Sequence, residues 1–326
     1  MQMRSRTRYA LAIAAVLAVL GSLYAYRMQH HSYITGSARI SIWQWDSVAQ
    51  LSGQDAAAMV RTLHEENVSE VFVRIDDYID IHEGSNPESL DSFEAGLSQF
   101  IALAHEKGIM VDALGGGVDW ARDSHSYIPP LLVGFVADFN ASHQASAFDG
   151  IQFDVEPYSS AEYPGNEKSM IEEYFAFVRN TIGEAKRAGN LRVGFTVPPW
   201  YDGSRGDPVM VGTSRGSKPL AYAMIDALEE YGNGYLVVMA YRAKGDATIA
   251  AAENTLGYAE ANAPHTEIWI GQEMGKVSEP GVSFYNLPKD AFAAEAHRID
   301  AYFSKNRAYA GISIDDYSSY ARFLER

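Results

Sequence analysis

The sequence predicts a single (β/α)8 TIM barrel preceded by an N-terminal apolar segment. Eight short runs of apolar or β-branched residues recur along the chain, helical stretches separate them, and no glycine-rich nucleotide fingerprint follows the first run. Strands that alternate with helices are typical of a parallel sheet, and eight repeats match a closed barrel. A doubly wound open sheet is the alternative, but it would normally carry that fingerprint after its first strand.

The predicted strands are nearly continuous apolar runs, as expected for parallel strands buried on both faces. They cover Ala38–Trp45, Val68–Ile75, Ile109–Leu114, Gly150–Val155, Leu191–Val197, Tyr235–Tyr241, Glu267–Gly271 and Tyr309–Ile314. The helices between them cover Gln54–Glu66, Ser92–Lys107, Pro130–Ala145, Glu167–Arg187, Lys218–Tyr231, Thr248–Ala261, Lys289–Lys305 and Tyr317–Arg326. The connections after several strands are long, and long loops on one face of a barrel predict a binding cleft there.

The N-terminus predicts export. Arg4, Arg6 and Arg8 precede an apolar run of about 18 residues, which is near the minimum length that spans a bilayer. We therefore interpret residues 1–27 as a signal peptide or signal anchor, 28–37 as a linker and 38–326 as the catalytic barrel. We favour an uncleaved membrane anchor with the barrel on the periplasmic or extracellular side. Cleavage after Ala25 would instead release a secreted protein.

The composition excludes several classes of function. The 326 residues carry a net charge of -16, which disfavours binding to nucleic acid. The chain has no cysteine, so disulfides, thiolate metal sites and a cysteine nucleophile are excluded. The sequence also lacks a histidine pair at metal-binding spacing. We expect neither a metal nor another cofactor.

Acidic and aromatic residues recur where the predicted strands end, and the active sites of such barrels lie at these ends. This combination suits sugars, whose C–H faces stack on rings while their hydroxyl groups hydrogen-bond to acids. We predict a substrate-binding mouth formed by Trp43, Trp45, Arg74, Asp76, Asp112, Gln152, Tyr158, Trp200, Arg242 and Asp315. The two arginines either bind an anionic sugar group or pair with neighbouring acids, and we favour pairing.

The fourth predicted strand carries the most specific segment, FDGIQFDVEPY from Phe148 to Tyr158. Residues two apart in a strand share a face, so Gln152, Asp154 and Glu156 should point into the barrel and its mouth. When two carboxyl groups lie next to each other, the pKa of one is raised relative to the other, so one of them can stay protonated while the other is ionised. We expect Glu156 to donate a proton to a leaving glycosidic oxygen and Asp154 to orient it.

This segment resembles the motif Asp-Gly-x-Asp-x-Asp-x-Glu of the family-18 glycoside hydrolases, the chitinase-like TIM barrels. Here the motif runs from Asp149 to Glu156. The resemblance implies that Glu156 is the general acid and that Asp154 assists the N-acetyl group of the substrate. The family also ends its sixth strand with Met-x-Tyr-Asp, and Tyr241 matches the tyrosine of that motif.

Two positions depart from the family pattern. Gln152 replaces the innermost Asp of the fourth strand, and Arg242 replaces the Asp that follows Tyr241. These departures are consistent either with a changed substrate or with a barrel that binds sugars without cleaving them.

A second resemblance offers another mechanism. The chain also looks similar to the large clan of retaining glycosidases, which have an acid Glu on the fourth strand, usually in Asn-Glu-Pro, and a nucleophilic Glu at the end of the seventh. Val155 replaces the Asn of that motif here. In this sequence Glu156 precedes Pro157, and Glu273 ends the seventh strand. This resemblance would make Glu156 the acid/base and Glu273 the nucleophile.

The sequence thus predicts an extracytoplasmic glycoside hydrolase that cleaves a polysaccharide or an amino-sugar glycan. We favour Asp154-assisted catalysis over a Glu273 nucleophile. A non-catalytic carbohydrate-binding barrel and a barrel enzyme of another class, such as a lyase, are the alternatives. The expected partners are an oligo- or polysaccharide and, through the N-terminal segment, a membrane.

Overall fold

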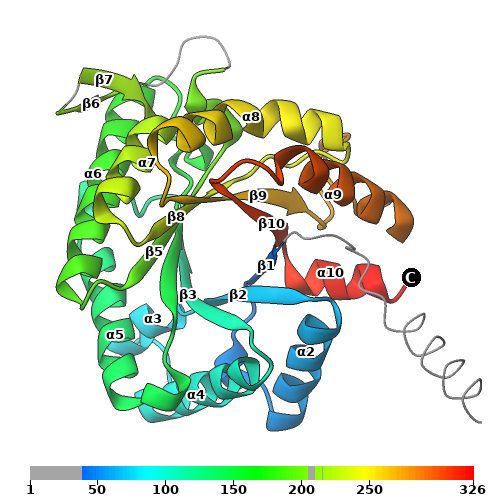
Figure 1. Cartoon of the computed structure of the whole chain (residues 1–326). Helices are drawn as coiled ribbons and strands as arrows, with labels where there is room; N and C mark the ends of the chain where they lie inside the picture. The colour runs from blue at the N-terminus through cyan, green and yellow to red at the C-terminus, as the bar shows by residue number, and fades with distance from the viewer. Residues whose placement is uncertain (1–38, 205–209, 215) are drawn as a thin grey trace, which may run out of the picture.

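The computed structural model describes residues 39–204, 210–214 and 216–326. Its eight parallel strands are β1 (Arg39–Gln44), β2 (Val68–Arg74), β3 (Met110–Gly116), β4 (Gly150–Asp154), β5 (Arg192–Val197), β8 (Gly234–Val238), β9 (Glu267–Glu273) and β10 (Tyr309–Asp315). They close into a barrel in the order β1-β10-β9-β8-β5-β4-β3-β2. Helices surround the barrel (Figure 1). The predicted (β/α)8 barrel is confirmed.

The outer helices agree with the predicted ranges to within a few residues. They are α2 (Gly53–Glu65), α4 (Leu90–Glu106), α5 (Ile128–Ser142), α6 (Glu167–Arg187), α7 (Leu220–Tyr231), α8 (Gly245–Asn262), α9 (Lys289–Phe303) and α10 (Tyr317–Leu324). Two predicted loops contain further structure, namely the helix α3 (Asp77–Glu83) and an antiparallel hairpin of β6 (Met210–Thr213) and β7 (Gly216–Pro219). The hairpin lies against α6 and α7 (Figure 1).

The predicted membrane segment and linker, residues 1–27 and 28–37, lie outside the described residues. Across the ranges given above, no helix is long and apolar enough to cross a bilayer.

Large side chains fill the middle of the barrel. An inner cluster consists of Trp43, Phe72, Leu114, Tyr235, Val237, Trp269 and Ala310. A glycine makes room for one of these rings, because a Cβ on Gly194 would lie 2.1 Å from Cζ of Tyr235. A filled interior is typical of this fold, so chemistry is expected at the carboxyl ends of the strands.

A buried ionic network occupies the opposite end of the barrel, where the strands begin. The Arg192 guanidinium binds the carboxylates of Glu70 and Asp112, with 2.8 Å to Asp112. It also lies 3.4 Å from Glu267, which pairs with Arg39. We refer to these five residues as the basal network.

The prediction that Asp112 binds substrate at the mouth is wrong. Asp112 is the third residue of β3, it is fully buried, and it accepts a hydrogen bond of 2.8 Å from the Tyr235 hydroxyl. The strand continues to Gly116, past its predicted end at Leu114. The side chain therefore faces inward as expected, but at the basal end of the barrel.

Candidate active site

The end of β4 places two carboxyl groups at the mouth. Asp154 is the last residue of the strand, and Glu156 follows two residues later. The Thr196 hydroxyl on the neighbouring strand β5 donates to Asp154 Oδ1, and the Tyr158 hydroxyl donates to Glu156 Oε1. On the other side, Gly116 of β3 leaves space, because a Cβ there would lie 2.7 Å from the Asp154 carbonyl oxygen. Both carboxyl groups are thus held from adjacent elements.

The environment of Asp154 favours its protonated form. Burial, followed by the negative charge of Glu156, raises the pKa of Asp154 to about 7, although the Thr196 hydrogen bond opposes this shift. Two interacting carboxyl groups titrate as a pair. Because its pKa is about 7, Asp154 retains its proton up to roughly neutral pH.

Tyr241 joins this pair from the loop that follows β8. Its hydroxyl donates to Asp315 Oδ2 at 3.3 Å, at the end of β10. Burial holds the pKa of Tyr241 well above its usual range, and negative charges add to the effect, those of Asp315, Asp154, Glu273 and Glu156. The tyrosine therefore remains a hydrogen-bond donor, and the charges of all three predicted catalytic acids act on it.

Asp315 closes the mouth beside Tyr241. Burial, and then the charge of Glu273, hold the pKa of Asp315 well above its usual range, while a hydrogen bond from the Trp45 side chain opposes this. Trp45 packs against the inner cluster and is only partly exposed. Asp315 ends β10 and Trp45 directly follows β1, so both residues lie at strand ends, as predicted.

Glu273 is the last residue of β9. Its Oε1 accepts a hydrogen bond from the backbone amide of Gly275, and burial raises the pKa of its carboxyl group, with a further contribution from the charge of Asp316. The carboxylate is therefore tied to the β9–α9 loop on the β10 side of the mouth.

Arg74 forms the predicted pairing with acids. Its guanidinium lies 3.0 Å from Asp77 Oδ1 and 3.7 Å from Asp76 Oδ2, and it donates to the Trp45 carbonyl oxygen at 3.3 Å. Burial raises the pKa of Asp76 to about 7 despite the positive charge of Arg74. These contacts make Arg74 an internal counterion at the β2 end.

The favoured pairing of Arg242 with acids is not observed. Its guanidinium donates to the Tyr241 carbonyl oxygen at 2.6 Å. No carboxylate of the described chain forms an ion pair with it.

Trp43 and Gln152 lie deeper than predicted. The Trp43 indole donates to Gln152 Oε1 at 2.6 Å, and these side chains are 1% and 0% exposed. Gln152 occupies the interior one inward-facing position below Asp154. The prediction that Trp43 and Gln152 contact substrate is therefore wrong, because the strand-end residues lie between them and solvent.

Aromatic side chains form a wall beside Glu156. Tyr158 and Trp200 meet edge to face, with ring centroids 5.3 Å apart, and both are partly exposed. The neighbouring Tyr201 is 1% exposed and packs into the core. The wall available to a ligand thus consists of Tyr158 and Trp200.

Thr196 is the functional residue that sequence reasoning missed. It is almost fully buried in β5, next to β4, and its hydroxyl bonds to Asp154. The sequence did contain a signal, because alternate residues of β5 face the interior of the barrel and Thr196 is one of them. A polar residue at an inward position beside the acidic strand could have been identified as a partner.

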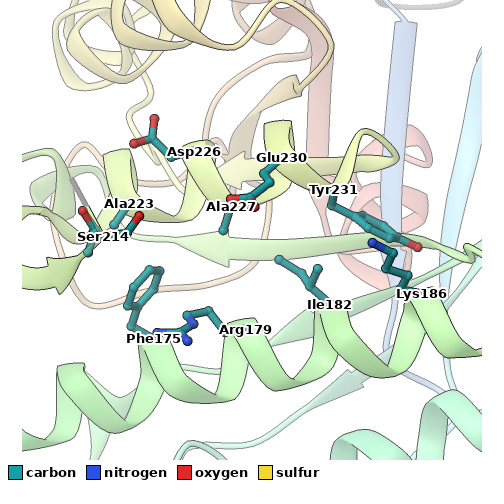
Figure 2. A pocket seen from close by; sticks show the side chains of 11 residues that line it. Phe175, Arg179, Ile182, Lys186, Ser214, Ala223, Asp226, Ala227, Glu230 and Tyr231 are labelled. Atoms are coloured by element: carbon teal, nitrogen blue, oxygen red, sulfur yellow. The ribbon is translucent and has the colours of Figure 1, made fainter.

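A separate groove of about 390 Å³ lies on the outer wall, between α6 and α7. Figure 2 shows Phe175, Arg179 and Ile182 of α6 facing Ala227 and Glu230 of α7 across it. The groove is lined by none of the strand-end residues, so it is separate from the candidate site.

Neither a protein-family model nor a curated protein sequence matches this chain. Among solved structures, the chain is similar to a GH18 chitinase from Pseudoalteromonas aurantia, with a TM-score of 0.57 and 14% identity over 88% of this chain and 96% of that chain. The two proteins share the barrel fold.

Two further solved structures have lower TM-scores. The spore cortex-lytic enzyme SleL of Bacillus cereus has a TM-score of 0.49 at 14% identity and covers 89% of this chain and 75% of its own. A D-psicose 3-epimerase has a TM-score of 0.45 at 14% identity, over 85% of this chain and 84% of that one. At these identities the similarity describes the fold alone.

Proposed function

We propose that this protein is a glycoside hydrolase that cleaves a polysaccharide or an amino-sugar glycan, with Glu156 as the general acid. The observation that carries the proposal is the Asp154–Glu156 pair at the end of β4, held by Thr196 and Tyr158, in which Asp154 keeps a proton up to about pH 7. A general acid needs such a proton at the working pH. The barrel shared with a GH18 chitinase supports the same class of reaction.

In the proposed reaction, Glu156 gives its proton to the glycosidic oxygen as the bond from that oxygen to C1 breaks. Asp154, which is ionised once its proton has passed to Glu156, accepts a hydrogen bond from the acetamido N–H of the sugar, and the acetamido oxygen attacks C1. Water then opens the cyclic intermediate and returns a proton to Glu156. The Tyr241 hydroxyl, protonated in this site, is placed to donate to the acetamido oxygen.

The remaining mouth residues bind the sugar in this proposal. Trp200 and Tyr158 offer ring faces or edges next to Glu156. Glu273 contributes a hydrogen-bond acceptor from the β9 side. We favour this role over that of a nucleophile, because the Gly275 amide already engages one of its oxygens and Asp315 and Asp316 are acidic neighbours.

We also propose that the enzyme acts outside the cytoplasm, anchored in a membrane by the apolar run between Tyr9 and Tyr26. Membrane fractionation of the full chain and of a chain that starts at residue 28 tests this location. Recovery of both forms in the soluble cytoplasmic fraction would contradict it.

Asp154→Asn is expected to lower kcat for cleavage of N-acetylated glycans by about 10²-fold, since the amide cannot provide the charge that orients the acetamido group. Release of reducing ends from a panel of polysaccharides, including chitin oligomers, measures the effect. The amide can still bond to Thr196, so the unfolding midpoint should change little. Unchanged cleavage by Asp154→Asn would count against assistance by this residue.

The pH profile should report the proton of Asp154. We expect kcat/KM to fall above about pH 7, because Asp154, whose pKa is raised to about 7, then loses the proton that it passes to Glu156. Below that pH the pair keeps the proton that the leaving oxygen needs. Initial rates between pH 5 and 9 test this, and Asp154→Asn should displace the alkaline limb. A rate that rises steadily through pH 9 would be inconsistent with a proton supplied by Asp154.

A further inference from the structure

A second cavity lies beside the candidate active site, between the β3–α5 and β4–α6 loops. Its volume is about 520 Å³, which is within the usual range for small-molecule sites. Val118, Asp119, Arg122 and His125 line it from the first loop, and Ser160 and Glu162 line it from the second.

Hydrogen bonds connect both walls of this cavity to the catalytic strand. The Gly117 amide, just before Val118, donates to the Asp154 carbonyl oxygen at 3.2 Å. The Ser159 amide, just before Ser160, donates to the Glu156 carbonyl oxygen at 2.9 Å. Ser159 itself lines the cavity, so the cavity wall begins three residues after Glu156.

Ion pairs link the two walls. The Arg122 guanidinium lies 3.3 Å from Glu173 of α6 and 3.7 Å from the exposed Glu162 of the second loop. One arginine therefore connects the first loop with the second loop and with α6, and the pair with the less exposed Glu173 is the shorter one. A site whose shape exists before binding loses less entropy when the ligand arrives.

The lining suits an uncharged sugar. The charge of Arg122 is already matched by Glu162 and Glu173, and Asp119 adds a further negative charge, so an anionic sugar would be repelled. Asp119, His125 and Ser160 offer polar groups for hydroxyls. Val118, 37% exposed, offers an apolar surface for a C–H face.

We propose that this cavity is a second subsite, which binds an uncharged pyranose unit of the glycan beyond the bond that is cleaved. The inference rests on the proposed function and extends it to the length and charge of the substrate. Oligosaccharides long enough to reach from Glu156 into the cavity should bind more tightly than shorter ones, and neutral oligomers more tightly than uronates of equal length.

Ala161→Trp tests the subsite, because Ala161 is exposed and lines the cavity, so the indole would fill it. The matched control is Ala141→Trp, at an exposed position near the end of α5. Calorimetric titration of Glu156→Gln protein with N-acetylglucosamine oligomers of two to six units gives Kd without turnover. We expect Kd to fall about tenfold once the oligomer reaches the cavity, and this gain to vanish in Ala161→Trp but not in Ala141→Trp.

The possible outcomes separate the subsite from the proposed function. If longer oligomers gain the same affinity in Ala161→Trp as in its control, the subsite proposal is overturned. If the gain depends on Ala161 but the protein with Glu156 intact releases no reducing ends, the subsite stands and the hydrolase proposal fails. Oligomers that show no binding at any length would overturn both.

Discussion

Glu156→Gln is expected to lower kcat for glycan cleavage by about 10²- to 10⁴-fold, the usual contribution of a general acid. An amide has no proton of suitable acidity for the leaving oxygen. Its oxygen can still accept the Tyr158 hydroxyl, so the packing at the end of β4 should be preserved. Reducing-end release measures the loss, and circular dichroism and thermal unfolding verify the fold.

A substrate with a better leaving group sharpens this test. A nitrophenyl glycoside needs little protonation as its bond breaks, so the defect of Glu156→Gln should be much smaller on it than on an oligosaccharide. Glu172→Gln, an exposed substitution on α6, is the matched control and should retain normal rates. Full oligosaccharide cleavage by Glu156→Gln would rule out this residue as the acid.

Arg192→Met is expected to destabilise the barrel by about 3–5 kcal/mol, because it removes the cation of the basal network. Glu70 and Asp112 are 1% and 0% exposed, and without Arg192 they would be buried carboxyl groups facing each other. Burial already raises the pKa of Asp112 to about 7 even with the arginine present. Urea unfolding followed by tryptophan fluorescence measures the loss.

A surface arginine provides the comparison for the basal network. Arg187 pairs with Glu184 on α6 and is 68% exposed, so Arg187→Met should cost no more than about 1 kcal/mol. Adding Asp112→Asn to Arg192→Met should recover part of the lost stability, since one buried negative charge is removed. Equal losses from the two arginine substitutions would mean that the basal network contributes no more than a surface pair.

The fold was predictable because its signal is repetitive. Each strand of the barrel is buried on both faces, and therefore its sequence is an apolar run that needs no tertiary information to recognise. The additional elements lack that signal. Helix α3 has no buried residue, and the hairpin strand Gly216–Pro219 has none either. Their structures depend on packing against the rest of the barrel.

The sequence predicted which side chains of the candidate site point into the barrel, but it did not predict how far below the mouth each of them lies. Alternation along a strand shows which side chains point inward, and it correctly grouped Asp154 with Glu156. It does not show how far each residue lies from the mouth, which depends on where the strand begins and ends. Asp112 and Gln152 therefore face inward as predicted, yet lie below the surface that a ligand can reach.

The filled interior described above constrains how a long polymer can be handled. The inner cluster and the basal network obstruct the axis of the barrel below Asp154. A polysaccharide therefore cannot be threaded through this protein as through a ring, and it must lie across the mouth. In the proposed reaction, both ends of the cleaved polysaccharide would leave on the side of the barrel from which the polysaccharide arrived. A protein anchored in a membrane would therefore have to turn the mouth of its barrel toward the substrate.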